Sequence, residues 1–168
     1  MFRVGDRVVY GSHGVCVIVD SEERSVDRKK MRYLVLEPEG QTGTRFYVPE
    51  HNPAALAKMR PLLDKESIDR LLSSDEIRGA EWIEDENRRK QCYRELISGT
   101  DYVALLKMVH SIHIYKNQQL ESGKKLHLCD VNFLRDAEKL ISEEFAVVLN
   151  MATSEVGGLC SEGYESLI

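Results

Sequence analysis

The stretch VGDRVVYGSHGVCVIVD, residues 4–20, holds two short apolar runs that meet at Gly11-Ser12-His13-Gly14. β-Branched residues dominate both runs, which is typical of strands. The glycines supply the backbone freedom that a tight connection between strands needs. The stretch therefore predicts two strands joined at a sharp corner, where His13 packs or forms a hydrogen bond instead of doing chemistry.

Similar short strands recur through the first sixty residues. The strand-like runs lie at 8–10, 15–19, 33–36 and 46–48, and a fifth is expected near 58–60. Polar or glycine-bearing stretches separate them at 11–14, 22–32 and 39–44. Pro49 and Pro53 end the fourth run, because proline has no amide hydrogen for a strand ladder. A sheet of this size has to bury one face, so we expect a small curled β-barrel.

The remainder of the chain carries helical patterns. Aspartates at helix starts and glycines after helix ends are typical caps, and apolar residues recur three and four positions apart. Helices are expected after Asp64, over about 76–97, from Asp101 to Gly123, and from Asp130. Beyond Asn150 the pattern decays. The sequence predicts an α+β chain with a barrel domain at 1–63 and a helical domain at 64–168. The helical domain holds about four or five helices and a loose tail from about 152.

Charge and composition limit the function. Residues 1–63 carry 10 Lys/Arg and 8 Asp/Glu, whereas residues 64–168 carry 13 and 20. Neither half has the basic excess of a strong non-specific nucleic-acid binder. No apolar run approaches the roughly 18 residues of a membrane span, and no signal-peptide pattern opens the chain. We expect a cytoplasmic monomer with no membrane partner and with its four cysteines as free thiols.

Candidate catalytic groups are weak. Zinc could use His110, His113 and His127 near Cys129, but these residues lack the paired spacing of a zinc finger. Ser12-His13 offers a hydroxyl beside an imidazole, with no third group to orient the ring. Acidic pairs on amphipathic helices are typical of solvated faces. We therefore expect no enzyme, no metal and no cofactor, and keep a small enzyme with a pocket around the three histidines as an alternative.

Two basic clusters stand out. One joins Arg28-Lys29-Lys30 to Arg32 between strands, and the other joins Arg88-Arg89-Lys90 to Arg94 on a predicted helix. Each is also compatible with an ordinary solvated surface. Trp82, the single tryptophan, comes six residues before the second cluster. An apolar ring beside basic residues can wedge into the minor groove at an opened base step.

The order of several short motifs resembles the CarD/CdnL family of bacterial transcription regulators. The motifs are Phe2-x-Val4-Gly5-Asp6-x-Val8-Val9-Tyr10, His13-Gly14, Tyr33-Leu34-Val35-Leu36 and Val48-Pro49. They follow the amino-terminal module of that family, which also occurs in transcription-repair coupling factors. The resemblance covers about residues 1–72 and implies a Tudor-like (SH3-like) barrel.

The resemblance also implies partners. Family members bind the β subunit of bacterial RNA polymerase through the barrel and stabilise the promoter open complex through helices that contact DNA. For polymerase binding it points to Arg24 and to Tyr47, where the family usually has arginine, and we add Arg28 and Arg45 as candidates. For DNA binding the candidates are Trp82, Arg88, Arg89, Lys90 and Arg94.

Trp82 departs from the family pattern. Asp85 stands where the family's wedge tryptophan would fall, and Trp82 comes three residues earlier. That spacing is about one helical turn, which would leave Trp82 on the same helix face. The acidic residues after it repel phosphate. An alternative function is therefore a protein-interaction adaptor whose acidic helical domain binds a protein instead of DNA.

Overall fold

The computed structural model describes residues 2–26, 29–41, 43–73, 75, 77 and 80–156. The chain divides into two compact units, which we call unit 1 (Met1–Leu62) and unit 2 (Leu63–Ile168). Among the described residues, no helix combines the length and the hydropathy of a membrane span. Cys16, Cys92 and Cys129 are free thiols, and Cys160 lies outside the described residues.

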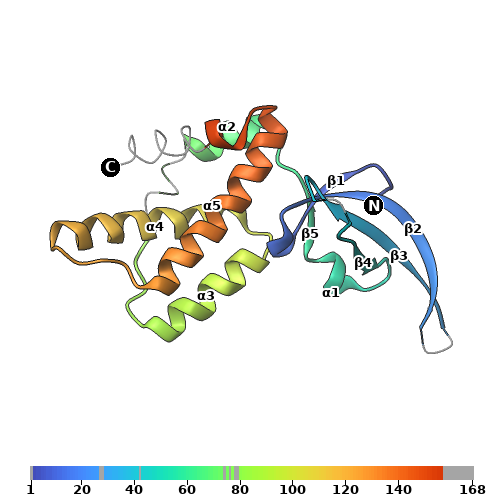
Figure 1. The fold of residues 1–168 in the computed structure, drawn as a ribbon, viewed down its shortest axis with the longest axis horizontal. Helices are drawn as coiled ribbons and strands as arrows, with labels where there is room; N and C mark the ends of the chain where they lie inside the picture. Colours follow the sequence, from blue (N-terminus) through green and yellow to red (C-terminus); the bar gives the residue numbers. More distant parts are fainter. Residues whose placement is uncertain are drawn as a thin grey trace. The chain divides into compact units, whose positions relative to one another are not determined.

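Unit 1 is a five-stranded antiparallel sheet (Figure 1). Its strands follow the order β4-β3-β2-β1-β5, so β4 and β5 form the two edges. The elements are β1 (Arg7–Tyr10), β2 (Val15–Val26), β3 (Lys29–Pro38), β4 (Phe46–Pro49), the short helix α1 (Pro53–Leu56) and β5 (Met59–Pro61). The five predicted strands are therefore confirmed, including the short fifth one.

The core of unit 1 lies on one face of this sheet. Alternate side chains of a strand point to the same face, and the apolar ones here do so. The core consists of Val8, Cys16, Ile18, Leu34, Leu36, Val48 and Met59. Between Ile18 and Asp20 the register of β2 against β3 shifts by one residue. Such a bulge bends the strand and lets β2 run on past the core.

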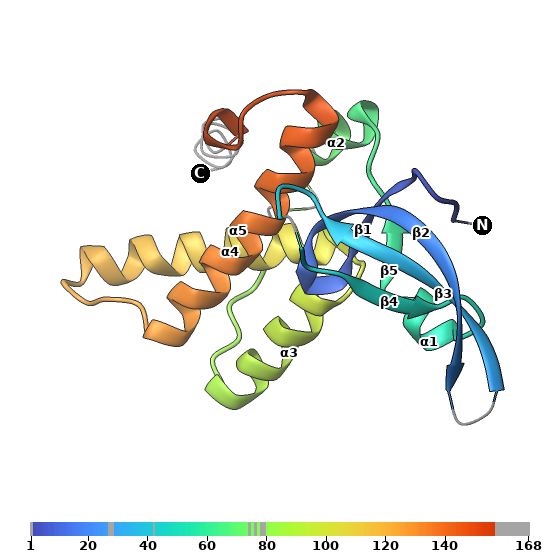
Figure 2. The same cartoon turned by 45° about the vertical axis from the view of Figure 1, so that its right-hand side comes forward.

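The stretch 22–32 was expected to separate two strands, and this expectation was wrong. β2 and β3 run through it as a paired ribbon, from Glu22 opposite Tyr33 to Val26 opposite Lys29. The ribbon continues past β1 and β4 (Figure 2). Both faces of such a ribbon meet water, so its side chains need no apolar alternation. Its strands carry charged side chains that pair across the ribbon, as Lys30 does with Glu23 at 2.9 Å.

The corner between β1 and β2 is a single 3₁₀ turn, η1 (Gly11–His13). Gly11 and Gly14 have φ angles of 46° and 72°, a region that favours glycine. The ring of His13 lies 4.1 Å from that of Phe46, measured between centroids, and it stacks on Tyr10 at 5.3 Å. The predicted packing role of His13 is confirmed.

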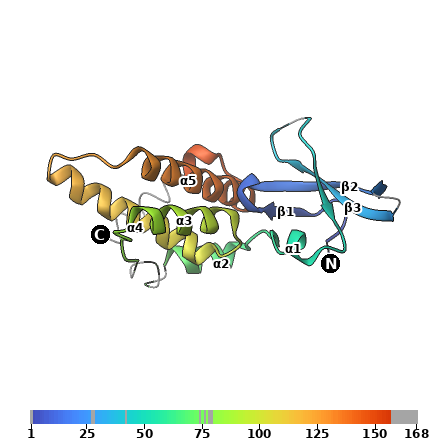
Figure 3. The same ribbon diagram turned by 90° about the horizontal axis from the view of Figure 1, so that it is seen from below.

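Unit 2 is helical, and this confirms the α+β class predicted for the chain. Its helices are α2 (Lys65–Leu72), α3 (Glu86–Ser98), α4 (Tyr102–Glu121) and α5 (Leu128–Leu149). Helices α3, α4 and α5 pack against one another (Figure 3). Residues three and four apart on α4 and α5 form the centre of the core: Leu106, Val109, Ile112, Ala137, Ile141 and Phe145. The predicted caps Asp64 and Asp101 accept hydrogen bonds from the amides of Ser67 and Ala104.

Two helix starts differ from the prediction. Helix α3 begins at Glu86, ten residues later than expected, because the carboxylate of Asp85 accepts a hydrogen bond from the amide of Arg88 and caps the helix there. Trp82 therefore lies in an extended connection, and the argument from one helical turn was wrong. Helix α5 begins at Leu128, so Asp130 lies inside its first turn.

The end of the chain is described only in part. Residues 153–156 are helical, and Val156 is fully buried in the core of unit 2. The rest of the predicted tail, residues 157–168, lies outside the described residues.

Candidate functional site

Strands β2, β3 and β4 place a set of predicted and unpredicted side chains on the face of unit 1 opposite the core. Arg24 pairs with Met31, Glu22 with Tyr33, and Val35 with Tyr47. Paired residues share a face, and Met31, Tyr33 and Val35 alternate with the core residues of β3. Below, "the outer face" means Arg24, Met31, Tyr33, Arg45 and Tyr47.

Two of the predicted polymerase contacts touch each other on the outer face. The guanidinium carbon of Arg24 lies 3.6 Å from the centroid of the Tyr47 ring. Such cation–π contacts hold both groups in place at a surface. Arg24 also donates a 3.0 Å hydrogen bond to Glu22, and this bond raises the pKa of Arg24. Tyr47 is half-buried, and Val35, its neighbour across the strands, is fully buried.

Arg45 lies beside the same tyrosine. Its Nε donates a 2.7 Å hydrogen bond to Glu37, and this bond, with a smaller contribution from Tyr47, raises the pKa of Arg45. Glu37 comes two residues after Val35 on β3, so it belongs to the same face. The outer face thus offers two fixed cations around an aromatic ring. Arginine, tyrosine and methionine are the residues that protein interfaces favour.

Arg28, the remaining predicted polymerase contact, lies outside the described residues. Met31 and Tyr33 belong to the outer face, but neither was predicted from the sequence as a polymerase contact. The signal was available: once the ribbon is recognised, strict alternation from Val35 back through Tyr33 to Met31 places all three on one face. Among the strands that the structure describes, β4 is the last on its side of the sheet, so it adds an edge without a ladder partner next to these side chains.

In unit 2, Trp82 is half-buried between two planar groups. Its indole stacks on the ring of Tyr115, with 3.7 Å between centroids and 7° between planes. The guanidinium carbon of Arg89 lies 4.3 Å from the indole centroid. A phenol ring and a guanidinium cannot share one face of an indole at these distances without overlapping. Tyr115 and Arg89 therefore cover opposite faces of Trp82.

Arg89 was predicted as a DNA contact, but the structure places it in the interior. Only 3% of this residue is exposed. It forms two parallel hydrogen bonds to Asp130, of 2.9 and 3.0 Å, and it donates to the carbonyl oxygens of Ile83 and Glu84. Burial opposes the charged form, yet the hydrogen bonds and charge of Asp130 raise the pKa of Arg89. Four of the five N–H groups of this guanidinium are therefore used inside unit 2.

The other members of the second basic cluster lie nearer to solvent. Arg88 and Arg94 are exposed, and the half-buried Lys90 forms an ion pair with Glu86 that lowers the pKa of Glu86. Lys90 and Arg94 are one turn apart and share a helix face. Glu81 and Glu84 flank Trp82 and are exposed. The surface around Trp82 is therefore mixed in charge.

Exposed apolar side chains occur where α4 ends and α5 begins. Leu120, Leu128 and Val131 belong to this turn, and Lys124 and Lys125 between the two helices are exposed as well. None of these five residues was predicted from the sequence to be functional. Leu128 comes two residues before Asp130, which holds Arg89 against Trp82. Leu128 therefore lies within one helical turn of the carboxylate that binds Arg89.

The three histidines considered as zinc ligands have different environments. Nε2 of His113 lies 2.8 Å from a carboxylate oxygen of Glu138, and His110 is buried in α4. His127 is exposed at the start of α5. Within the part of the chain that the structure describes, no three or more histidine, cysteine or acidic side chains gather as metal ligands do.

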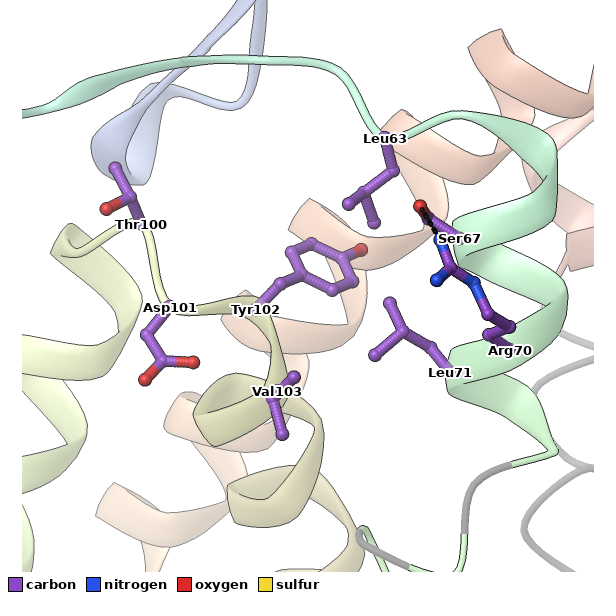
Figure 4. Close-up of a pocket in the computed structure, with 8 residues that line it drawn as sticks. All are labelled: Leu63, Ser67, Arg70, Leu71, Thr100, Asp101, Tyr102 and Val103. Atoms are coloured by element: carbon purple, nitrogen blue, oxygen red, sulfur yellow. Dashed lines mark hydrogen bonds between the residues drawn. The ribbon is translucent and has the colours of Figure 1, made fainter.

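Unit 2 also has an open pocket of about 420 Å³ between α2 and the start of α4 (Figure 4). It is lined by Leu63, Ser67, Arg70, Leu71, Thr100, Asp101, Tyr102 and Val103. Arg70 donates a 3.0 Å hydrogen bond to the Ser67 hydroxyl, and Asp101 caps α4. None of the side chains predicted as functional lines this pocket.

Comparison with known proteins supports the resemblance seen in the sequence. Residues 2–63 match the model of the CarD-like/TRCF RID domain family. This match confirms the resemblance for that stretch, which is nearly the whole of unit 1, and it implies an interaction with RNA polymerase. No similar protein was found among the curated proteins.

Proposed function

We propose that this protein, with a CarD-like/TRCF RID domain at residues 2–63, is a transcription regulator that binds the β subunit of bacterial RNA polymerase through unit 1. The observation that carries this proposal is the convergence of Arg24 and Arg45 on Tyr47 beside an edge strand. The protein works as a cytoplasmic monomer and performs no catalytic step of its own.

The outer face suits a protein partner in two ways. The free edge of β4 can extend its sheet into a partner by main-chain hydrogen bonds, which supply affinity. The side chains next to it supply specificity, because Arg24 and Arg45 can pair with acidic groups while Tyr47 and Met31 bury apolar area. The family usually has arginine where this chain has Tyr47. Arg24 and Arg45, which lie beside Tyr47, supply a positive charge at this place instead.

A matched pair of charge reversals tests this surface. Arg45 and Arg7 are similarly exposed, and each pairs with a glutamate, Glu37 or Glu39. Arg7 lies on β1, two strands away from the β3–β4 pair. We expect Arg45→Glu to weaken binding of the full-length protein to immobilised bacterial RNA polymerase by about tenfold or more, and Arg7→Glu to leave it near wild type. Equal binding by both variants would show that the outer face is not part of the interface with RNA polymerase.

Unit 2 would then reach promoter DNA and stabilise the open complex. In this proposal Trp82 meets the opened base step, and the cations Arg88, Lys90 and Arg94 contact phosphates. The exposed turn between α4 and α5 adds Lys124, Lys125 and the apolar Leu128, a combination suited to minor-groove contacts. The interior position of Arg89 makes it a support for Trp82 in this scheme.

A second candidate function gives unit 2 a protein partner. The excess of acidic residues in 64–168 and the exposed Glu81 and Glu84 beside Trp82 favour it. Salt dependence separates the two functions, because each phosphate contact releases counterions. The logarithm of the association constant should fall with the logarithm of salt concentration with a slope of about −3 if Arg88, Lys90 and Arg94 contact phosphates, and of about −4 to −5 if Lys124 and Lys125 do so as well. A flat dependence, or no DNA binding, would favour the protein partner.

A further inference from the structure

Trp82 leaves only part of its surface for a partner. Tyr115 and Arg89 cover its two faces, yet the side chain remains half-exposed. The exposed part is therefore the rim of the indole. A nucleobase that stacked on a face of Trp82 would first have to displace one of the two covering groups.

Neither covering group is easily displaced. Arg89 is held by both oxygens of Asp130 and by two backbone carbonyls in the interior. Tyr115 lies on α4, which is part of the core of unit 2. Its ring is nearly parallel to the indole, at van der Waals distance. The arrangement links α3, α4 and α5 at one point, since Arg89, Tyr115 and Asp130 each come from a different helix.

Tyr115 and Arg89 fix the indole of Trp82, which its own backbone segment does not. Trp82 lies in a non-helical connection, so no helix fixes the direction of its side chain. An unsupported tryptophan in such a segment would sample several rotamers and would lose that freedom on binding. Stacking on both faces removes most of the freedom beforehand.

We infer that Tyr115, Arg89 and Asp130 are positioning residues that clamp Trp82, so that it meets DNA with the rim of its indole while both faces stay covered. This inference rests on the proposed contact between unit 2 and DNA. It adds a mode of contact: apolar insertion of a rigid edge at an opened step, in place of base stacking on a free ring.

Because Trp82 is the single tryptophan, its fluorescence reports on the clamp directly. The experiment uses the full-length protein and a DNA duplex with a short mismatched bubble. Acrylamide quenching measures access to the indole, and fluorescence anisotropy of labelled DNA measures affinity. The variants are Tyr115→Leu, which removes the stacked ring, and Tyr115→Phe, which keeps it. Asp130→Asn keeps the shape of the group that holds Arg89 and removes its charge.

We expect Tyr115→Leu to increase quenching of Trp82 and to weaken duplex binding by about tenfold, as loss of a good aromatic contact would. Tyr115→Phe should restore both properties to wild type. Asp130→Asn should change them in the direction of Tyr115→Leu. The duplex should quench the emission of wild-type Trp82 only weakly, because no base stacks on its covered faces.

Two results would overturn the inference about the clamp and leave the proposed DNA contact standing. One is a Tyr115→Leu variant with more accessible Trp82 and unchanged affinity for DNA, while Trp82→Ala binds weakly. The other is strong quenching of wild-type emission by the duplex, which indicates a base stacked on the ring. Unchanged affinity in Trp82→Ala would overturn the proposed DNA contact itself, and with it the inference. Circular dichroism of each variant separates these outcomes from loss of the helical fold.

Discussion

Asp130 accepts two parallel hydrogen bonds from Arg89, a residue 41 positions earlier in the chain, and both side chains are almost completely buried. The pair joins the first turn of α5 to α3. The pairing offsets part of the free-energy cost of removing these two groups from water. The pair also brings the Arg89 guanidinium to the indole of Trp82.

Removal of one partner should be costly. We predict that Asp130→Ala destabilises unit 2 by about 3–5 kcal/mol, because it leaves an uncompensated guanidinium in the interior. Urea denaturation followed by circular dichroism measures this change. Asp136→Ala is the matched control on the same helix, since Asp136 pairs with Arg135 at the surface. That pair should contribute at most about 1 kcal/mol. Similar losses in the two variants would contradict the account of Arg89 and Asp130.

Two leucines of unit 2, one buried and one exposed, provide a second matched pair of variants. Leu106 is 0% exposed in the core, whereas Leu128 is 76% exposed. Leu106→Ala should destabilise the protein by about 2–5 kcal/mol, from lost burial and from the cavity left behind. Leu128→Ala should change the free energy of unfolding by no more than about 0.5 kcal/mol. If Leu128→Ala weakens DNA binding at unchanged stability, the turn between α4 and α5 belongs to the DNA surface.

The corner of unit 1 should respond to pH. Burial, and secondarily the charge of Lys58, lower the pKa of His13 from its ordinary value of 6.5. The unfolded chain therefore takes up the proton more readily than the folded one. Stability should decrease as pH falls below 6.5 towards the lower folded value, and it should then level off. His13→Gln should lack this component of the pH dependence.

Nuclear magnetic resonance of the His13 ring measures the pKa directly. Lys58→Met should raise the value but leave it below 6.5, because burial is the larger cause. A His13 pKa above 6.5 in the wild type would show that the stacked rings of Tyr10 and Phe46 favour the charged form.

Local chemistry explains which elements the sequence could predict. Strands such as Val15 to Val19 are β-branched and apolar, and the Asp101 cap lies directly before an apolar helical pattern. These signals act over a few residues. The ribbon at 22–32 was missed because its exposed, charged faces carry no apolar alternation, although its backbone pairs throughout. The start of α3 depended on which of several acidic residues capped it, and propensity alone does not decide that.

The candidate sites depend even more on contacts between residues that are far apart in the sequence. The contact of Arg24 with Tyr47 joins β2 to β4 across the strand between them, and the resemblance to a known family was needed to select both residues. Arg89 looked like its neighbours Arg88 and Lys90, because only the fold reveals a buried partner 41 residues away. Trp82 was recognised, but its covering by Tyr115 and Arg89 was not.

The most direct test of the polymerase proposal is a titration of the full-length protein against the isolated β lobe of a bacterial RNA polymerase. Wild type is compared with Arg24→Glu and Tyr47→Glu, with Arg7→Glu on β1, two strands away from β3, as the control. We predict saturable binding by wild type and Arg7→Glu, and losses of about tenfold or more in the other two variants. No binding by wild type at tens of micromolar, or equal binding by all four proteins, would contradict the proposal.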